Sequence, residues 1–392
     1  MKLLKNEEFD VAVVGGGFGG ISAALAAARG GKKVVLFERQ FILGGLATAG
    51  LVNVYLPLCD GYGHQVSFGI AEELFKLSIK HGDLGRYPAN WLDGIGTKTE
   101  NDPRYMVDFN PQMFAILAER LLLSVGVTIM YGSYVVDCEV ENSRISCIHV
   151  ENKSGRTAYY VDSVIDASGD FDIGHFAGVS SETHERGNVL AAWYFTSDEN
   201  GYRCKQFGFA DVPEEEMKKE IVKLIDRRFS GLDAAEISEM VSLSHDKIYN
   251  DYLERREKGE NIELATIASI PQLRMTRKIV GEYTLTYNEE GQYFEDSIGI
   301  VSNWKKRGPV WEVPFRTLYS REIKNLITAG RITSVDERLW DVMRVIPCCA
   351  VTGEAAGTVA ALTSDFAALD VKLLQNELMK NGVKLHLEEV IK

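Results

Sequence analysis

Residues 9–38 read FDVAVVGGGFGGISAALAAARGGKKVVLFE, and this stretch decides the fold. An apolar run at 11–14 leads directly into the motif Gly-x-Gly-x-x-Gly at 15–20, and an Ala-rich segment follows. A second apolar run, 34–37, ends on Glu38. The full dinucleotide-binding pattern needs a strand before the glycines, a helix after them and an acid about 20 residues further on, and all three are present here. A glycine motif without this context would be weak evidence. The stretch therefore predicts a β-α-β unit that binds an adenine dinucleotide.

Each residue type in the motif has a physical role. Gly15 allows the tight turn out of the strand, Gly17 lets a pyrophosphate approach the backbone, and Gly20 lets the helix lie close to the sheet. The N-terminus of the following helix offers free N–H groups and a positive dipole end to the phosphates. Glu38 can accept hydrogen bonds from the ribose hydroxyls of an adenosine, and it would repel a 2′-phosphate.

The fingerprint serves FAD and NAD alike, and later segments favour FAD. The pair Gly44-Gly45 follows soon after the acid and offers bare backbone along a long cofactor, although an ordinary loop would look the same. Two apolar strands, in 162–170 and 325–331, end on small residues that let the backbone contact a ligand at the sheet edge. Residues 344–357 then open a helix whose N-terminus would stabilise a reduced, anionic flavin. No second glycine fingerprint follows a strand, because Asp93-Gly94-Ile95-Gly96 lacks that context.

This order of segments resembles the FAD-dependent oxidoreductase family of the glutathione-reductase-type flavoproteins, and within it a bacterial group related to fumarate reductase flavoprotein subunits. The stretches that carry the resemblance are LGGLATAGLV (43–52), FGIAEEL (68–74), VIDASGD (164–170), RMTRKIVGEYTLT (274–286), VPFRTLY (313–319), NLITAGR (325–331) and RVIPCCAVTGEAAGTVAAL (344–362). Residues 181–270 match nothing in the family. The resemblance implies non-covalent FAD and no single substrate.

Motif and resemblance together place the cofactor contacts in both halves of the chain. The predicted contacts are Gly15, Gly17, Phe18, Gly19, Gly20, Phe37, Glu38, Arg39, Gly44, Gly45, Leu46, Val135, Ala167, Ser168, Gly169, Gly330, Arg331 and Val345.

The expected fold class is α/β, with a Rossmann-like FAD-binding domain that contains a parallel sheet and a β-meander. Four short strands between Thr128 and Val161 read as the meander, and a strand is expected at 283–286. Helices are expected at 67–81, from Asn110-Pro111 through Leu123, and within 212–258. Because both ends of the chain must meet around one FAD, we assign residues 1–54, 105–180 and 320–392 to the FAD-binding domain. Residues 55–104 and 181–319 are assigned to an interleaved α+β cap that carries the substrate site.

Composition excludes several classes of function. The chain has 392 residues, 45% apolar and 25% charged, as in globular proteins. A net charge of −13 without a basic stripe argues against a nucleic-acid partner. The sequence contains no apolar run of about 18 residues, so we expect no membrane-spanning helix. The six cysteines show no CxxC or zinc spacing, so we predict no metal and no redox pair. Without an export signal at the N-terminus, the expected location is cytoplasmic. Assembly into a homo-oligomer stays open.

Three residues are candidates for the chemistry. Arg277, in an Arg-rich segment that borders the substrate site in the resembling family, could clamp a carboxylate or be only an ion-pair partner. His64, in a Gly-rich loop, could be a general acid or base, or a surface histidine. Cys349 matches a cysteine in the family's motif and stands at the start of the last helix, where a thiol pKa would be lowered; a small buried residue is the alternative.

The predicted function is hydride transfer between flavin N5 and a small polar organic substrate. Two alternatives come from other classes. A non-catalytic binding protein on the same fold would have an eroded phosphate loop, and the loop here is intact. A tRNA-modifying flavoprotein is disfavoured by the acidic charge.

Overall fold

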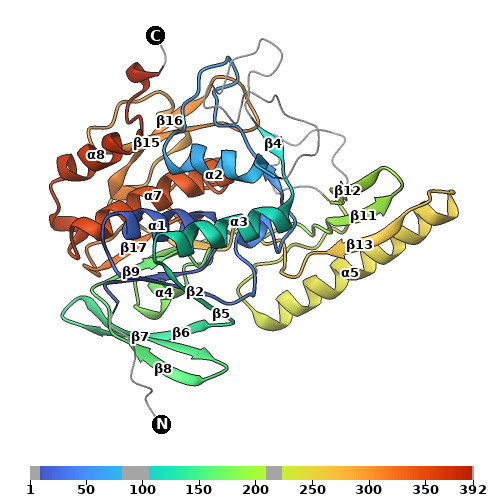
Figure 1. Cartoon of the computed structure of the whole chain (residues 1–392), viewed down its shortest axis with the longest axis horizontal. Coiled ribbons are helices and arrows are strands. Elements are labelled where there is room, and N and C mark those ends of the chain that lie inside the picture. The colour runs from blue at the N-terminus through green and yellow to red at the C-terminus, as the bar shows by residue number, and fades with distance from the viewer. Residues whose placement is uncertain (1–8, 82–105, 209–222, 391–392) are drawn as a thin grey trace.

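The computed structural model describes residues 9–81, 106–208 and 223–390. Its centre is a five-stranded parallel sheet of order β17-β9-β1-β2-β5 (Figure 1). The strands are β1 (Val11–Val14), β2 (Val34–Glu38), β5 (Thr128–Tyr131), β9 (Ser163–Asp166) and β17 (Leu326–Thr328). The first and last parts of the chain thus share one sheet, as the sequence predicts.

One face of the sheet is covered by two helices in close contact, α1 (Phe18–Arg29) and α7 (Ile346–Leu362). Glycines make this contact possible. A Cβ on Gly353 would lie 2.3 Å from the carbonyl oxygen of Gly19, and one on Gly357 would lie 2.1 Å from that of Ala23. The small residues of both helices therefore bring the start of α7 beside the glycine motif.

The opposite face of the sheet carries an antiparallel β-meander of β6 (Tyr134–Glu141), β7 (Arg144–Asn152) and β8 (Gly155–Tyr159). The turn between β6 and β7 passes through Asn142 and Ser143, both with positive φ. The predicted meander of four strands needs one correction. Its first strand, β5, pairs in parallel with β2 and so extends the central sheet.

Two further sequence predictions can be compared with the structure. The helix that starts at Asn110-Pro111 is confirmed, since the Asn110 side chain accepts hydrogen bonds from two backbone N–H groups of α3 (Pro111–Ser124). The strand expected at 283–286 is wrong: Leu285 makes only an isolated bridge, and the strand of this region is β14 (Arg277–Ile279). The Thr286 and Glu289 side chains form a capping box, which turns the chain into a short 3-10 helix.

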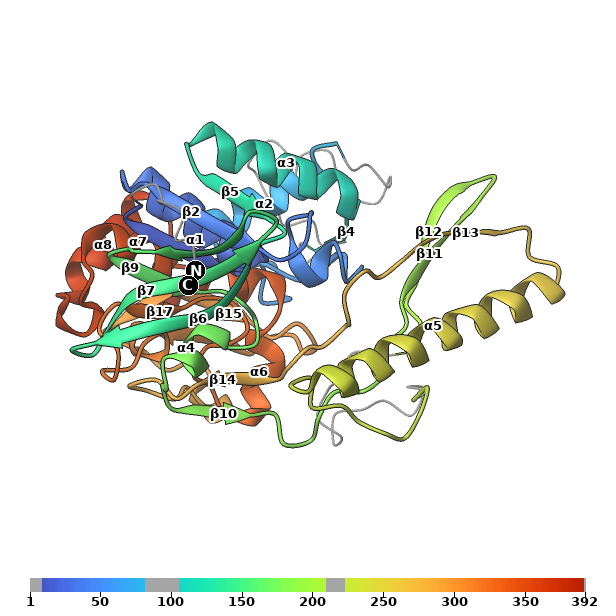
Figure 2. The same cartoon turned by 90° about the horizontal axis from the view of Figure 1, so that it is seen from below.

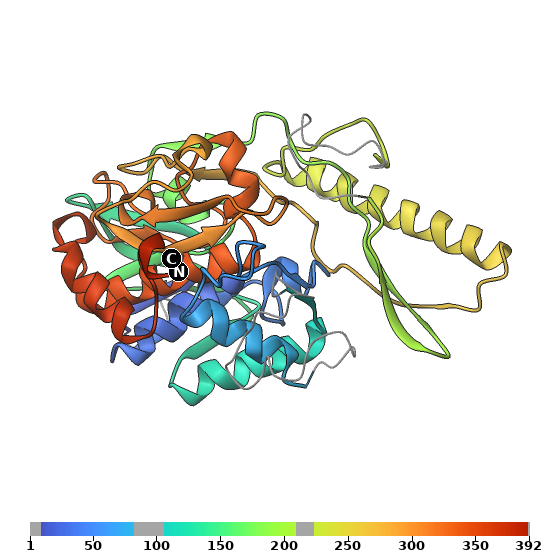
Figure 3. The same cartoon turned by 90° about the horizontal axis from the view of Figure 1, so that it is seen from above.

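A long arm projects from this body, as Figures 2 and 3 show. It consists of α5 (Ala234–Glu257) and a small sheet of β11 (Tyr194–Asp198), β12 (Gly201–Lys205) and β13 (Glu263–Ile267). The sheet is tied to α5 by the hydroxyl of Tyr194, which donates to Asp251 at 2.5 Å. The predicted helical stretch 212–258 is confirmed by α5 in its second part, but residues 223–233 are not helical, and the residues before 223 in this stretch lie outside the described part of the chain.

The other elements surround the central layers. They are α2 (Ile70–Ile79), α4 (Asp172–Phe176), α6 (Glu337–Met343), α8 (Val371–Lys380), β3 (Val54–Tyr55), β4 (Val107–Asp108), β10 (Ser181–Thr183), β15 (Ser297–Ser302) and β16 (Val310–Pro314). Although their residues fall in the predicted cap, α2 and β15 pack against α7 of the body. Within the described ranges, no single helix is long and apolar enough to cross a membrane; only α6 and α7 taken together reach that length, and they are bent by 88°.

Candidate cofactor site

A cavity runs along the edge of the sheet where the parallel strands end. Of the predicted cofactor contacts, it is lined by Gly15, Gly17, Phe18, Gly19, Phe37, Glu38, Arg39, Gly44, Gly45, Leu46, Val135, Ala167, Ser168, Gly169, Gly330 and Arg331. Gly20 and Val345 are not in the lining. The fold thus gathers these residues from six places in the sequence around one cavity.

The three glycines of the motif differ in what surrounds them. Gly15 has φ +102°, and a Cβ there would lie 2.4 Å from the carbonyl oxygen of Ala167. A Cβ on Gly20 would lie 1.8 Å from the carbonyl oxygen of Gly15, so Gly20 serves packing and not contact with a ligand. A Cβ on Gly17 would meet no heavy atom within 4 Å. Because Gly17 lines the cavity, the bare backbone at this position faces space that a ligand can fill.

Glu38 holds the glycine loop in place. Its carboxylate accepts hydrogen bonds from the backbone N–H groups of Gly16 and Gln40, both at 2.7 Å. The side chain is buried, and burial raises its pKa above the ordinary value, while the two backbone hydrogen bonds act in the opposite direction. The acid is thus fixed at the end of β2 beside the cavity.

The second glycine pair lies alongside the first motif. The N–H of Gly44 donates to the carbonyl oxygen of Gly16 at 2.8 Å, and Gly17 and Gly44 form a parallel bridge. Both Gly44 and Gly45 have positive φ, which glycine adopts without steric cost. This close pairing sets two stretches of exposed backbone on the cavity wall.

Charged side chains meet at the ends of β9 and β17. Arg331 donates to the carbonyl oxygen of Gly169 at 2.6 Å and pairs with Asp170 at 2.8 Å, and Arg39 lies 3.8 Å from the same carboxylate. Burial alone would raise the pKa of Asp170, but the guanidinium groups of Arg331 and Arg39 hold it below its ordinary value. Asp170 is therefore an anion that positions two cavity-lining cations. Sequence analysis did not select it, although it ends the same small-residue segment.

Arg277 belongs to the same charged network but is not among the described residues that line the cavity. Its Nε donates to the carbonyl oxygen of Asp170 at 3.1 Å, and its guanidinium lies 3.7 Å from the Asp172 carboxylate. Asp172 does line the cavity, and burial together with nearby Asp170 and Asp166 raises its pKa to about 7. A substrate role for Arg277 stays a prediction, and its observed contacts are those of an ion-pair partner.

Two further segments contribute to the cavity lining, the start of α7 and the segment that returns from the arm. The first contributes Arg344, Ile346 and Cys349, and the second contributes Ile270, Pro271 and Leu273. The expectation of a lowered thiol pKa at Cys349 is wrong. Burial raises the pKa of this thiol to about 12, although Arg331 and Arg344 act to lower it.

Arg344 is the cationic residue of this part of the cavity lining, and the sequence analysis did not predict it as a site residue. Its side chain is only 6% exposed and pairs with Asp341 at 2.5 Å. Lys305 reaches the same carboxylate at 2.5 Å from the loop after β15. In the sequence, the position of Arg344 just before the predicted last helix was the signal that could have identified it as a site residue.

His64 lies elsewhere. Its Nδ1 contacts the carboxylate of Asp60 on the same loop at 2.7 Å, and the residue is not among the described lining of the cavity. A role for His64 as general acid or base stays a prediction.

Comparison with known proteins agrees with this geometry. A family model described as FAD dependent oxidoreductase matches residues 10–191 and 183–378. The chain belongs to the FAD-dependent oxidoreductase family.

Individual relatives match over parts of the chain. A thiamine thiazole synthase from Pyrococcus horikoshii is 51% identical over 199 residues, which cover 47% of this chain and 65% of that protein. Another, from Desulfosudis oleivorans, is 59% identical over 44 residues, which cover 11% of this chain and 17% of that protein. Among solved structures, Thermovibrio ammonificans THI4 matches at 22% identity over 44% of this chain and 64% of that chain, with a TM-score of 0.30. The chain thus spans less than two thirds of the length of these relatives.

FAD is the cofactor of this oxidoreductase family, and the residues of the cavity fit it. Gly17 supplies the open backbone that a pyrophosphate needs, and Glu38 supplies an acceptor for ribose hydroxyls. The start of α7, which also lines the cavity, offers the positive end of a helix dipole. In addition to the predicted contacts, the lining includes Gly16, Gln40, Ser133, Tyr134, Asp170 and Asp172.

Proposed function

We propose that this FAD-dependent oxidoreductase transfers a hydride to or from a small polar substrate that carries a carboxylate. The observation that supports the proposal most is Arg344, a residue of the cavity lining just before α7 whose guanidinium is nearly buried and paired with Asp341. When bound, FAD supplies the hydride acceptor or donor at N5 of its flavin. The chain supplies binding, orientation and exclusion of water.

Arg344 suits a carboxylate for reasons of shape as well as charge. A guanidinium offers a planar fork of N–H donors that matches two carboxylate oxygens, which a lysine does not. Asp341 is fully buried and holds this fork by an ion pair, so the guanidinium does not need to be ordered when the substrate binds. In this arrangement Arg344 binds the substrate and Asp341 positions Arg344.

Apolar residues contribute to the same cavity lining as Arg344. They are Ile270, Pro271 and Leu273, from the segment that links the arm to β14. An ion pair or hydrogen bond formed beside such a wall is stronger than the same contact in bulk water. The wall therefore favours a small substrate with one anionic group over a large polar one.

The experiment uses the purified holoprotein and a panel of small carboxylic acids, with perturbation of the flavin absorbance as the signal. A ligand that perturbs the wild-type spectrum should bind Arg344→Met at least about tenfold more weakly, because a charged hydrogen bond contributes roughly 1.5–3 kcal/mol. Arg344→Lys should restore only part of this affinity.

Arg277→Ala is the matched control, since this arginine is near the cavity but outside its described lining. It should keep wild-type ligand affinity, and all three variants should retain FAD. Equal affinity in wild type and Arg344→Met, with loss in Arg277→Ala, would instead assign the carboxylate to Arg277.

A second candidate function comes from the relatives. The match of 51% identity with a thiamine thiazole synthase over 199 residues favours formation of the thiazole of thiamine as an alternative activity. Rescue of a bacterial strain that requires added thiazole would support this candidate. Absence of rescue by a well-expressed, flavin-loaded protein would remove it.

A further inference from the structure

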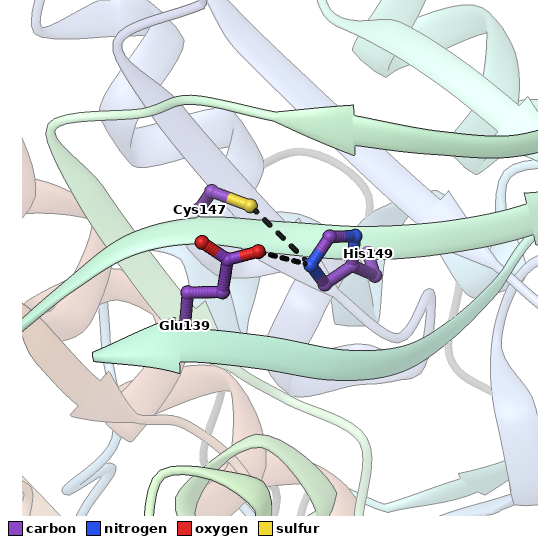
Figure 4. Close-up of side chains that lie close together, drawn as sticks. All are labelled: Glu139, Cys147 and His149. Atoms are coloured by element: carbon purple, nitrogen blue, oxygen red, sulfur yellow. Dashed lines mark hydrogen bonds and ion pairs between the residues drawn. The ribbon is translucent and has the colours of Figure 1, made fainter. Parts of the chain in front are cut away.

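A second cluster of reactive side chains lies on the β-meander, away from the residues that line the cavity. Figure 4 shows Glu139 of β6 and Cys147 and His149 of β7 pointing toward one another. Their donor atoms all lie within 4.8 Å of one another. From this convergence we propose that the three side chains form a binding site for a divalent cation of the zinc type.

The sheet register explains why these residues meet. Cys147 and His149 are two positions apart on β7, so both side chains project from the same face of the strand. Glu139 is the residue directly opposite Cys147 on β6. A shift of register between Glu139 and Val140 marks an irregularity beside the pair, and such bulges redirect side chains.

The distances suit a tetrahedral cation. Donors bound to zinc at about 2.0–2.3 Å are separated from each other by roughly 3.3–3.8 Å. The sulfur of Cys147 lies 3.7 Å from Nε2 of His149, which is already in this range. The Glu139 oxygen lies closer, 2.8 Å from the same nitrogen. Because the Glu139 side chain is 58% exposed, it can move outward by the small amount needed.

The same geometry argues against a cysteine nucleophile. In a nucleophilic triad the histidine contacts the cysteine with one ring nitrogen and the acid with the other. Here Nε2 of His149 faces both the sulfur and the carboxylate. Three donors aimed at one point are the arrangement of metal ligands.

The donor set selects the class of cation. Thiolate and imidazole favour Zn²⁺ and related transition metals, whereas Mg²⁺ and Ca²⁺ require several oxygen ligands. The sulfur is buried and the carboxylate is exposed, so the cation would lie near the surface, with its fourth position open to water. The neighbouring acids Asp137 and Glu151 are already paired with Arg156 and are not counted as ligands.

The site is separate from the flavin chemistry. Val135, which lines the cavity, precedes Glu139 by four residues on β6, or about 13 Å along an extended strand. A bound cation would link β6 to β7 and so stabilise the meander that carries Val135.

The test titrates the holoprotein with Zn²⁺ alone by calorimetry, after chelator treatment and with Mg²⁺ present in excess. We expect one Zn²⁺ per chain, a higher thermal midpoint on binding, and affinity at least about tenfold lower in Cys147→Ser and in His149→Ala. Glu151→Gln, on the same strand, and Cys204→Ser, a cysteine of the arm, should bind as wild type does.

Flavin content shows that each variant is folded, because the FAD-binding cavity does not include the three ligands. Absence of stoichiometric Zn²⁺ binding by the wild type, or equal affinity in wild type, Cys147→Ser and His149→Ala, would overturn the proposal.

Discussion

Replacing Gly17 with valine should weaken FAD binding and leave the fold intact. Gly17 has φ −72°, an ordinary value for any residue, and a Cβ there would meet no heavy atom within 4 Å. The folded apoprotein can therefore accept a Cβ at this position without a clash. Because Gly17 lines the cavity, the side chain of valine would take up space beside the glycine loop that a ligand could fill.

The size of the effect follows from the contacts that a phosphate would lose. A hydrogen bond between a backbone N–H and a charged phosphate oxygen contributes roughly 1.5–3 kcal/mol. Loss of one such bond weakens FAD binding roughly ten- to hundred-fold. Gly353→Ala is the matched control, because its Cβ would lie 2.3 Å from the carbonyl oxygen of Gly19 and would push α1 and α7 apart. Such overpacking costs about 1–3 kcal/mol of the free energy of unfolding.

The assay combines fluorescence titration of each apoprotein with FAD and unfolding of the same apoproteins in urea. Gly17→Val should show weak FAD binding with a wild-type unfolding midpoint, and Gly353→Ala should show a lower midpoint. If Gly17→Val binds FAD as tightly as wild type does, the glycine loop does not contact the cofactor. If Gly17→Val unfolds at as low a urea concentration as Gly353→Ala does, the side chain at position 17 disturbs the fold, and the inference of open space there is wrong.

Three further predictions address two buried acids and the thiol of Cys349. Glu38→Ala should weaken FAD retention roughly ten- to hundred-fold, measured as FAD released during gel filtration, and unchanged retention would contradict a ribose contact. Burial raises the pKa of Glu354 to about 8, so the folded state holds a proton that the unfolded state releases, and stability should fall between about pH 5 and pH 8. Glu354→Gln should reduce that slope in urea unfolding at several pH values; an equally steep slope would show that other groups cause it. With its pKa at about 12, Cys349 should react with iodoacetamide far more slowly at pH 7 than a free exposed thiol does, and fast labelling located by mass spectrometry would refute this protonated state.

The central fold could be predicted because several local signals agree in one short stretch. The strand, the glycine turn, the small-residue helix and Glu38 each favour the same β-α-β unit, and the structure places β1, α1 and β2 accordingly. The later strands β9 and β17 were predicted for a similar reason, since each apolar run ends on small residues. Such segments can be predicted from the sequence because their local conformational preferences agree with the overall fold.

The errors come from places where a local signal competes with another. Residues 283–286 have strand-like composition, but Thr286 and Glu289 form a capping box that starts a short helix. This four-residue spacing was present in the sequence and was the signal to use. At Cys349 the helix terminus argues for a low thiol pKa, yet burial outweighs it. The depth of burial depends on packing from the rest of the chain and cannot be read from the residue's neighbours in sequence.

The proposed substrate site is harder to predict from the sequence, because the cavity wall joins residues that are distant in the chain. Arg277 and Arg344 are both arginines in segments that match the family, and composition does not distinguish them. The structure separates them by their surroundings: Arg277 is held by Asp170 and Asp172, whereas Arg344 lines the cavity together with Ile270 and Leu273. That second arrangement brings to one cavity residues that are more than seventy positions apart in the sequence. The same holds for Glu139, Cys147 and His149, whose convergence depends on the exact register of β6 and β7. The residues that bind the cofactor can be predicted from local motifs. The residues proposed here to bind substrate or metal come together only through contacts between segments that are distant in the sequence.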